Sequence, residues 1–227
     1  MIVIVDFGMG NLRSIQNMLK HIGIDSRISS DRTAIQDADK LILPGVGAFD
    51  NAIINIEKLH LREVLVGKAL NEKTPILGIC LGLQLFAKKS EEGSLPGLGL
   101  IDAEVVRFRF ASGNGISHPF RDGGLKIPHM GWNEVGPRNN SRLFAGLNDA
   151  ARFYFVHSYH LKCIDERDIA AATFHGYSFV SAIEKGNIYG VQFHPEKSHR
   201  FGMQVLKNFT GISEYVENAG HALPARA

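Results

Sequence analysis

Three short segments, far apart in the chain, carry residues whose types and spacing suit nucleophilic catalysis. The sharpest is Gly78-Ile79-Cys80-Leu81-Gly82, where an apolar run meets a predicted helix. Glycines two residues to either side of a nucleophile are typical of a nucleophile elbow, a strained strand-to-helix turn that holds the reactive atom above a sheet. A helix that starts at the thiol favours the thiolate form through its positive end. Taken alone, Cys80 fits equally well as a small buried apolar residue.

The second segment is Phe193-His194-Pro195-Glu196. Strand periodicity places residues two apart on one face, so His194 and Glu196 are expected to point the same way at a strand end, where Pro195 suits a chain leaving the sheet. A histidine beside a cysteine can act as its base, and a carboxylate behind the ring fixes its tautomer and orientation. By itself His194 is as well explained as a structural histidine. Together with the elbow, the pattern predicts a Cys80–His194–Glu196 triad.

The third segment is Pro44-Gly45-Val46-Gly47, which follows another apolar run. Glycines allow backbone N–H groups to face a ligand, and acyl transfer needs such donors at the developing oxyanion. The amide of Leu81, directly after the nucleophile, is the expected second donor. Without the other two segments this would be a plain Pro-Gly turn.

The elements that must position these residues alternate between strand and helix in the first half of the chain. Apolar runs predict strands at 2–5, 24–28, 41–43 and 75–79, and helical stripes predict helices at 11–22, 48–70 and from Leu81 onward. This alternation predicts a largely parallel sheet with helices on both faces. The second half predicts additional antiparallel strands at 104–108, 153–156, 169–174, 179–183 and 188–193, and a last helix at 199–216.

Composition and charge are those of one α/β domain. The chain has 227 residues, 44% hydrophobic and 21% charged, and its formal charge of +2 gives no argument for nucleic acid. The apolar run at 2–5 is too short for a signal peptide or a membrane span, so a reducing cytoplasm that keeps Cys80 free is expected. Residues 112–124 are predicted to form an exposed loop, and 218–227 a frayed tail.

Two other kinds of site are considered and set aside. Gly8-Met9-Gly10 hints at a dinucleotide fingerprint, but Arg13 occupies the place of its third glycine. His157, His160 and Cys163 could be drawn as a metal cluster, but a strand and its exit explain them better. No metal and no cofactor are therefore expected.

The order P-G-V-G, G-I-C-L-G-L-Q and H-P-E resembles the class I (triad) glutamine amidotransferases over nearly the whole chain. Within that class, the run D-F-G-M-G-N-L-R-S at 6–14 and the run P-H-M-G-W-N-E-V at 128–135 closely resemble HisH, the glutaminase subunit of imidazole glycerol phosphate synthase. The resemblance implies a single flavodoxin-like amidotransferase domain over 1–217, with the tail 218–227 outside it. The segment 112–124 is longer than is usual in that subunit.

For the mechanism, the resemblance implies that the Cys80 thiolate attacks the side-chain amide of L-glutamine and forms a γ-glutamyl thioester. His194 then protonates the departing ammonia and activates the water that releases glutamate, while Glu196 orients His194. The oxyanion donors would be Leu81 and either Gly47 or Val46, the latter after its peptide turns. Positions that hold the two ends of glutamine are matched by Gln84, Glu92, His157, Ser158 and Tyr159. From the residues alone, Gln84 and Glu92 read as ordinary polar helix-end residues.

The resemblance also implies a partner, because ammonia in neutral water is mostly protonated and no acceptor site is legible in this chain. In the resembling family the acceptor is a (β/α)8-barrel cyclase, HisF-like, in a heterodimer that serves histidine synthesis. Positions that face the cyclase are matched by Asn11, Ser14, Met130, Trp132 and Lys197, although Trp132 reads equally well as a core residue.

Three alternatives remain open at this stage. A paralogous glutaminase subunit could feed a different synthase, for example in surface-polysaccharide synthesis. A cysteine peptidase or esterase could use the same elbow, although Gln84 and the predicted oxyanion segment argue against it. A non-catalytic interaction subunit is disfavoured because every triad position is occupied.

Overall fold

Parallel strands from the first half of the chain form the centre of the fold. The computed structural model describes residues 1–110, 125–138, 141–148 and 151–212. Strands β1 (Ile2–Val5), β2 (Ser26–Ser29), β3 (Lys40–Gly45) and β4 (Ile76–Cys80) pair in parallel in the order β2-β1-β3-β4. Strand β13 (Ile188–Val191), from the far end of the sequence, pairs in parallel with β4. The predicted parallel sheet is confirmed, with β2 starting two residues later than expected.

The second half extends this sheet with mostly antiparallel strands. Beyond β13 follow β12 (Tyr177–Lys185), β10 (Tyr159–Cys163), β6 (Ala103–Arg107) and β5 (Lys89–Ser90), while β11 (Ile169–His175) pairs with β12 and β8 (Gly136–Pro137). A separate antiparallel pair consists of β7 (His129–Glu134) and β9 (Arg152–His157). Strands β7 and β10 are not predicted from the sequence, because their polar and aromatic residues give no clear apolar alternation.

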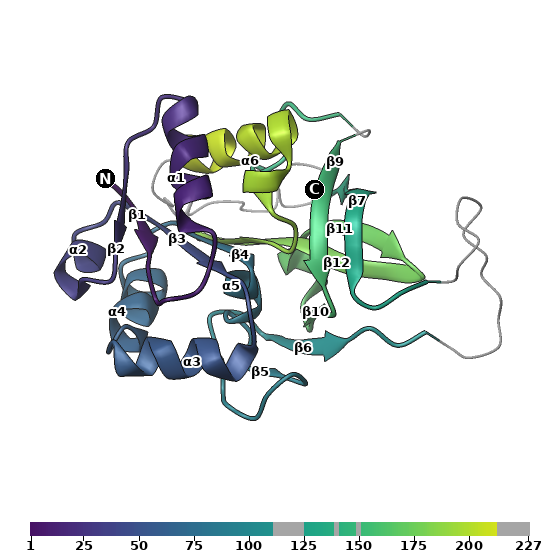
Figure 1. Ribbon diagram of the computed structural model, residues 1–227, viewed down its shortest axis with the longest axis horizontal. Coiled ribbons are helices and arrows are strands. Elements are labelled where there is room, and N and C mark those ends of the chain that lie inside the picture. The colour runs from purple at the N-terminus through teal and green to yellow at the C-terminus, as the bar shows by residue number, and fades with distance from the viewer. Residues whose placement is uncertain (111–124, 139–140, 149–150, 213–227) are drawn as a thin grey trace, which may run out of the picture.

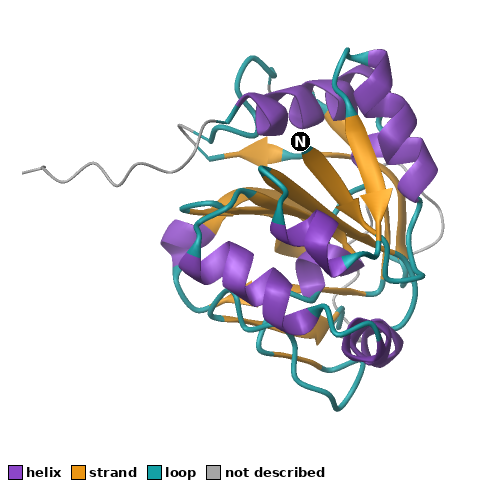
Figure 2. Ribbon diagram, turned by 90° about the vertical axis from the view of Figure 1, so that its left-hand side faces the viewer, coloured by secondary structure: helices purple, strands orange, loops and turns teal. Residues whose placement is uncertain are grey.

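Helices cover both faces of the sheet (Figures 1 and 2). Helices α1 (Leu12–His21) and α6 (His199–Gly211) lie on one face, and α3 (Phe49–Lys58) and α4 (Arg62–Val66) on the other. The pleat of β1 explains why there are two cores: Ile2 and Ile4 pack with α1 and α6, whereas Val3 and Val5 pack with α3 and α4. A short helix α2 (Arg32–Gln36) follows β2.

Two predicted helices are shorter than their sequence patterns suggest. The helix expected at 48–70 is interrupted at His60, whose φ is 53°, and ends in a π-helical segment, Gly67–Asn71. Helix α5 begins at Leu81 as predicted but ends at Gln84. The carbonyls of Leu85 and Phe86 accept hydrogen bonds from the amides of Leu98 and Ile101, and these distant partners replace further helical turns.

Helix α6 ends at Gly211 rather than at residue 216. The predicted loop at 112–124 and the tail at 218–227 lie outside the described residues, as does the predicted domain end at 217. Among the described residues, none of the helices combines the length and the apolar composition that crossing a bilayer requires.

Close contact between α5 and the sheet depends on two glycines of the elbow. A Cβ on Gly82 would collide with the carbonyl oxygen of Leu43 in β3. A Cβ on Gly78 would lie 2.7 Å from the backbone nitrogen and the Cα of Leu83. Since real Cβ atoms do not approach backbone this closely, α5 can rest on β3 and β4 only if both positions lack a side chain.

We therefore expect Gly82→Ala to lower the free energy of unfolding by roughly 1–3 kcal/mol, the cost of overpacking a well-packed site. Urea denaturation followed by far-UV circular dichroism measures this. Gly67→Ala is the matched control, because Gly67 has helical dihedrals and a methyl group there would meet no atom within 4 Å; alanine at this position should leave stability unchanged or raise it by about 0.5–1 kcal/mol. Equal stability of the two variants would contradict the packing argument.

Candidate active site

Cys80 lies at the junction of β4 and α5 and has the backbone strain expected of an elbow. Its dihedrals are φ 54° and ψ −108°, a conformation that residues with a side chain rarely adopt. Only 6% of its surface is exposed. The amide of Leu81, the first residue of α5, belongs to the N–H groups at a helix start that have no partner within the helix, so it is free for an oxyanion.

His194 and Glu196 follow β13, the strand next to β4, and the triad side chains therefore meet at one end of the sheet. The strand predicted at 188–193 ends earlier than expected: β13 ends at Val191, and Pro195–Lys197 form a 3-10 turn. Proline suits the first position of such a turn, which explains the early strand end. The turn nevertheless pairs the side chains, since His194 Nδ1 lies 2.9 Å from Glu196 Oε1.

The other ring nitrogen of His194, Nε2, is buried, and the ring interacts with the side chain of Cys80. Burial lowers the pKa of His194, but hydrogen bonding and electrostatic interactions with the Cys80 and Glu196 side chains outweigh burial and raise that pKa to about 10. The ring is thus held in its protonated form. Nδ1 is occupied by the carboxylate, which leaves Nε2 as the atom that can exchange a proton on the Cys80 side.

Gln84 and Gln192 form a buried amide pair next to the nucleophile. Gln84 Nε2 donates to the carbonyl oxygen of Tyr159 and to Oε1 of Gln192, both at 3.1 Å, and Gln192 Nε2 donates to Cys80 Sγ at 3.7 Å. Gln192 is not among the residues predicted from the sequence. The signal that could have found it is a polar residue inside the apolar run from Ile188 to Phe193, where an unpaired amide would be costly.

His157 belongs to a buried histidine pair rather than facing Cys80 directly. Its Nδ1 donates to Tyr159 O at 2.7 Å, and its Nε2 lies 3.0 Å from Nδ1 of His129. Burial lowers the pKa of His157 well below its usual value and that of His129 to about 3, so both rings are neutral at pH 7. Ser158 and Tyr159 are half-buried, and Ser158 O accepts the amide of Phe108.

Glu92 lies behind the predicted oxyanion segment. Its Oε2 accepts the backbone N–H of Phe49, the first residue of α3, at 3.0 Å, and burial raises its pKa. Asp50 fixes the neighbouring loop, because its carboxylate accepts the amides of Ser94 and Leu95. Glu92 therefore lies close to the segment that carries Val46 and Gly47. The hydrogen bonds by which Asp50 holds the Ser94–Leu95 loop are not predicted from the sequence.

The predicted oxyanion segment runs beside the nucleophile. Gly45, the last residue of β3, pairs in register with Cys80. Val46 is 49% exposed, and Gly47 has a φ of 128°, which only glycine adopts readily. Because Val46 is half-exposed, this turn is not packed into the core at that residue.

The residues predicted to face a partner lie on adjoining elements. Trp132 and Met130 of β7 are 46% and 60% exposed, so Trp132 is not a core residue. The indole of Trp132 stacks on His199 and meets the ring of Tyr154 edge-on, and Lys197 lies over that tyrosine ring. Asn11 and Ser14 lie at the start of α1, which packs against the Pro195–Lys197 turn.

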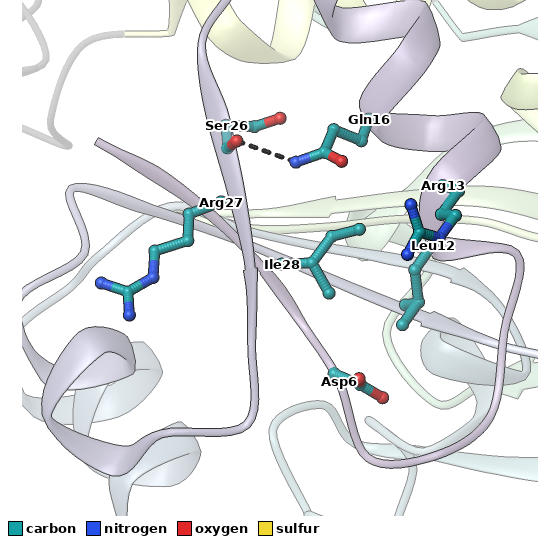
Figure 3. Close-up of a pocket in the computed structure, with 7 residues that line it drawn as sticks. All are labelled: Asp6, Leu12, Arg13, Gln16, Ser26, Arg27 and Ile28. Atoms are coloured by element: carbon teal, nitrogen blue, oxygen red, sulfur yellow. Dashed lines mark hydrogen bonds between the residues drawn. The ribbon is translucent and has the colours of Figure 1, made fainter.

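A separate surface cleft of about 520 Å³ lies between α1 and β2, lined by Asp6, Arg13, Gln16 and Arg27 among others (Figure 3). Gln16 spans it by donating to the backbone carbonyl of Ser26. The cleft contains none of the triad residues and is not assigned to the chemistry.

The electrostatics of His194 can be tested by replacing Glu196 with Gln, which keeps the size of the side chain and removes its charge. The protonated ring loses a buried counter-charge, so the pKa of His194 should fall by at least about one unit, and the ring should lose its proton at a lower pH. NMR titration of the His194 ring protons measures the change. Glu166→Gln, on an exposed turn, serves as the control that leaves the pKa of His194 in place.

Comparison with known proteins identifies the family. The chain matches the glutamine amidotransferase class-I family over residues 3–211. It is 50% identical to the imidazole glycerol phosphate synthase subunit HisH 2 of Methanococcus maripaludis, covering 92% of this chain and 98% of that protein. Identity to the HisH 2 subunit of Pseudomonas aeruginosa is 45%, over 93% and 100% of the two chains.

Solved structures share the fold. The fold is similar to that of a putative GMP synthase protein from Thermoplasma acidophilum, with a TM-score of 0.66, 23% identity and 92% of each chain covered. PurLQS from Thermotoga maritima gives a TM-score of 0.65 at 18% identity, over 92% of this chain and 96% of that one. By its sequence relatives, the chain belongs to the class-I glutamine amidotransferases, and within them to the HisH glutaminase subunits of imidazole glycerol phosphate synthase.

Proposed function

We propose that Cys80, His194 and Glu196 carry out the glutaminase reaction and that the ammonia passes to a barrel cyclase in a separate chain. The observation that supports the catalytic assignment is the position of His194, whose Nδ1 lies 2.9 Å from Glu196 and whose pKa is raised by its interactions with Cys80 and Glu196. An imidazolium next to a thiolate is the arrangement that makes a cysteine nucleophilic at neutral pH.

In the first half-reaction, the Cys80 sulfur attacks the side-chain carbonyl carbon of L-glutamine. The carbonyl electrons move onto oxygen, where the amide of Leu81 and an amide of the Val46–Gly47 segment receive the negative charge. Collapse of this intermediate breaks the C–N bond, and His194 gives its Nε2 proton to the departing nitrogen, which leaves as ammonia. The product on the enzyme is a γ-glutamyl thioester.

In the second half-reaction, neutral His194 takes a proton from water, and the resulting hydroxide adds to the thioester carbon. The C–S bond then breaks, which returns the thiolate of Cys80 and releases glutamate. Glu196 keeps Nδ1 protonated throughout, so Nε2 alone exchanges protons. Gln84, Glu92 and the Ser158–Tyr159 backbone are the groups that we assign to the two ends of the substrate. Since Cys80 is 6% exposed, glutamine can enter only if neighbouring side chains move.

We infer a partner chain because the released ammonia needs an acceptor. The relatives are named as subunits of imidazole glycerol phosphate synthase, which favours histidine synthesis over a paralogous synthase. We assign the surface around Trp132, Met130 and Lys197, with Asn11 and Ser14 beside it, to a HisF-like (β/α)8-barrel cyclase. A half-exposed tryptophan stacked on a second ring is a rigid aromatic anchor of the kind that dominates interface energies. A free thiol at the centre of the site is suited to the cytoplasm.

Replacing Cys80 with Ala should abolish glutamate release from glutamine, because no other described group supplies a nucleophile at that position. The assay measures glutamate in the presence of the cyclase and its ligand. Cys163→Ala is the matched control: burial raises the pKa of Cys163 to about 11, so its thiol is inert, and this variant should keep full activity. Hydrolysis by Cys80→Ala at the wild-type rate would refute the assignment.

Trp132→Ala should weaken cyclase binding by roughly 30-fold, which corresponds to a hot-spot loss of about 2 kcal/mol. Isothermal titration calorimetry gives the affinity, and glutamate release with and without the cyclase gives its stimulation, which should be large for the wild type. Ile164→Ala, at an exposed residue directly after β10, should match the wild type in both measurements. Full wild-type activity in the isolated chain would contradict the dependence on a partner.

A further inference from the structure

We propose that Gln192 is a further catalytic residue, whose side-chain amide donates a hydrogen bond to the Cys80 thiolate and holds the sulfur in its attacking position. This inference rests on the proposed function, in which Cys80 is the nucleophile. It adds a second donor at the sulfur, next to the imidazole of His194.

The position of Gln192 requires an explanation. It follows β13 directly, its surface is completely buried, and its backbone N–H donates to the carbonyl of Ser181. A buried primary amide has two donor hydrogens and one acceptor oxygen to satisfy, and leaving them unpaired costs about 1–3 kcal/mol each. The side chain reaches two polar neighbours: Nε2 lies 3.7 Å from Cys80 Sγ, and Oε1 lies 3.1 Å from Gln84 Nε2.

The orientation of the Gln192 amide follows from its neighbours. The carbonyl oxygen of Tyr159 can only accept, so the atom of Gln84 that faces it at 3.1 Å must be the NH₂ group. That same NH₂ group faces Gln192 at 3.1 Å, so the atom of Gln192 on that side must be the oxygen. The NH₂ group of Gln192 then points to the sulfur of Cys80, as a donor.

The carbonyl of Tyr159 is itself held from a second direction. Tyr159 O also receives the Nδ1 proton of His157, whose Nε2 accepts from Nδ1 of His129. Nε2 of His129 in turn faces the amide of Asn133. Hydrogen bonds therefore connect Asn133 on β7, through His129 and His157, to the carbonyl of Tyr159. From that carbonyl, the amides of Gln84 and Gln192 continue the connection to the sulfur.

The donor matters because burial disfavours a thiolate. A cysteine that is 6% exposed has lost nearly all its water, and protein donors must replace that hydration for a thiolate to persist. Hydrogen bonds to a charged acceptor are about twice as strong as neutral ones, so an amide on the sulfur favours the thiolate over the thiol. Once the C–S bond forms, the thioester sulfur is a weak acceptor. The hydrogen bond from Gln192 is therefore strong only while the sulfur is a thiolate, before it attacks and after the C–S bond breaks.

The test measures how fast iodoacetamide modifies Cys80 as a function of pH in the full chain, with the labelled residue identified by mass spectrometry. Gln192→Met removes the donor at nearly constant size, and Gln192→Glu replaces it with an acceptor. We expect modification at pH 7 to be about ten-fold slower in Gln192→Met, and slower still in Gln192→Glu. In both variants the midpoint of the pH profile should move to higher pH by about one unit. Ser181→Ala, which removes a buried hydroxyl on the neighbouring strand, should reproduce the wild-type profile.

The pH profile separates a role at the sulfur from a merely structural one. A uniform loss of reactivity with an unmoved midpoint would overturn the inference, and so would profiles identical to the wild type. The proposed function fails separately, if wild-type Cys80 is not labelled or if Cys80→Ala still hydrolyses glutamine.

The wild-type chain provides a second measurement that does not depend on a variant. The side-chain amide protons of Gln192 should shift in the NMR spectrum with the same pH midpoint as Cys80 modification, and this titration should disappear after carboxamidomethylation of Cys80. Amide signals that do not respond to pH over that range would overturn the proposal.

Discussion

The site depends on one backbone constraint, the strained turn that joins β4 to α5. Cys80 has a φ of 54°, and the helix that follows can reach the sheet only because Gly78 and Gly82 have no side chains. This close approach fixes the sulfur at the C-terminal end of β4. Parallel strands bring their C-terminal ends to one edge, so β13 places His194 next to the sulfur, and β3 places the Gly45–Gly47 turn on its other side. The topology brings the three segments together although they lie far apart in the sequence.

The thiolate that the proposed reaction requires has to be stabilised almost without water, and the polar groups around Cys80 can do this in two ways. His194 supplies a positive charge that is itself supported by Glu196, whose side chain is 1% exposed. The amides of Gln84 and Gln192 supply dipoles whose direction is set by the carbonyl of Tyr159. The His194–Glu196 pair and the two glutamine amides are almost completely dehydrated, so their interactions are stronger than in water. Removing one partner of either pair would therefore be costly. Burying these polar groups costs free energy on folding, and the same burial makes the site pre-organised.

Sequence patterns predict the parts of this arrangement that follow from local rules. The glycines of the elbow, the apolar parallel strands and the spacing of His194 and Glu196 all have local causes, and the family match confirms the fold that they indicate. The patterns fail where distant hydrogen bonds decide the outcome. Helix α5 ends early because the 97–101 segment binds the carbonyls that follow it, and β7 forms only by pairing with β9. Gln192 escapes prediction because its side-chain partners come from β4 and α5, which no local window contains.

The surface that we assign to the cyclase is linked to His194 through a short path of contacts. Trp132 meets the ring of Tyr154, and the carbonyl of Tyr154 accepts the amide of His194 at 2.9 Å. The hydroxyl of Ser198 joins the same two residues, since it accepts the amide of Tyr154 and donates to the carbonyl of His194. A partner that fixes the tryptophan and tyrosine rings therefore acts on a strand that holds His194 from both sides. The proposed partner surface and His194 therefore share strand β9, through hydrogen bonds of the backbone and of the Ser198 hydroxyl.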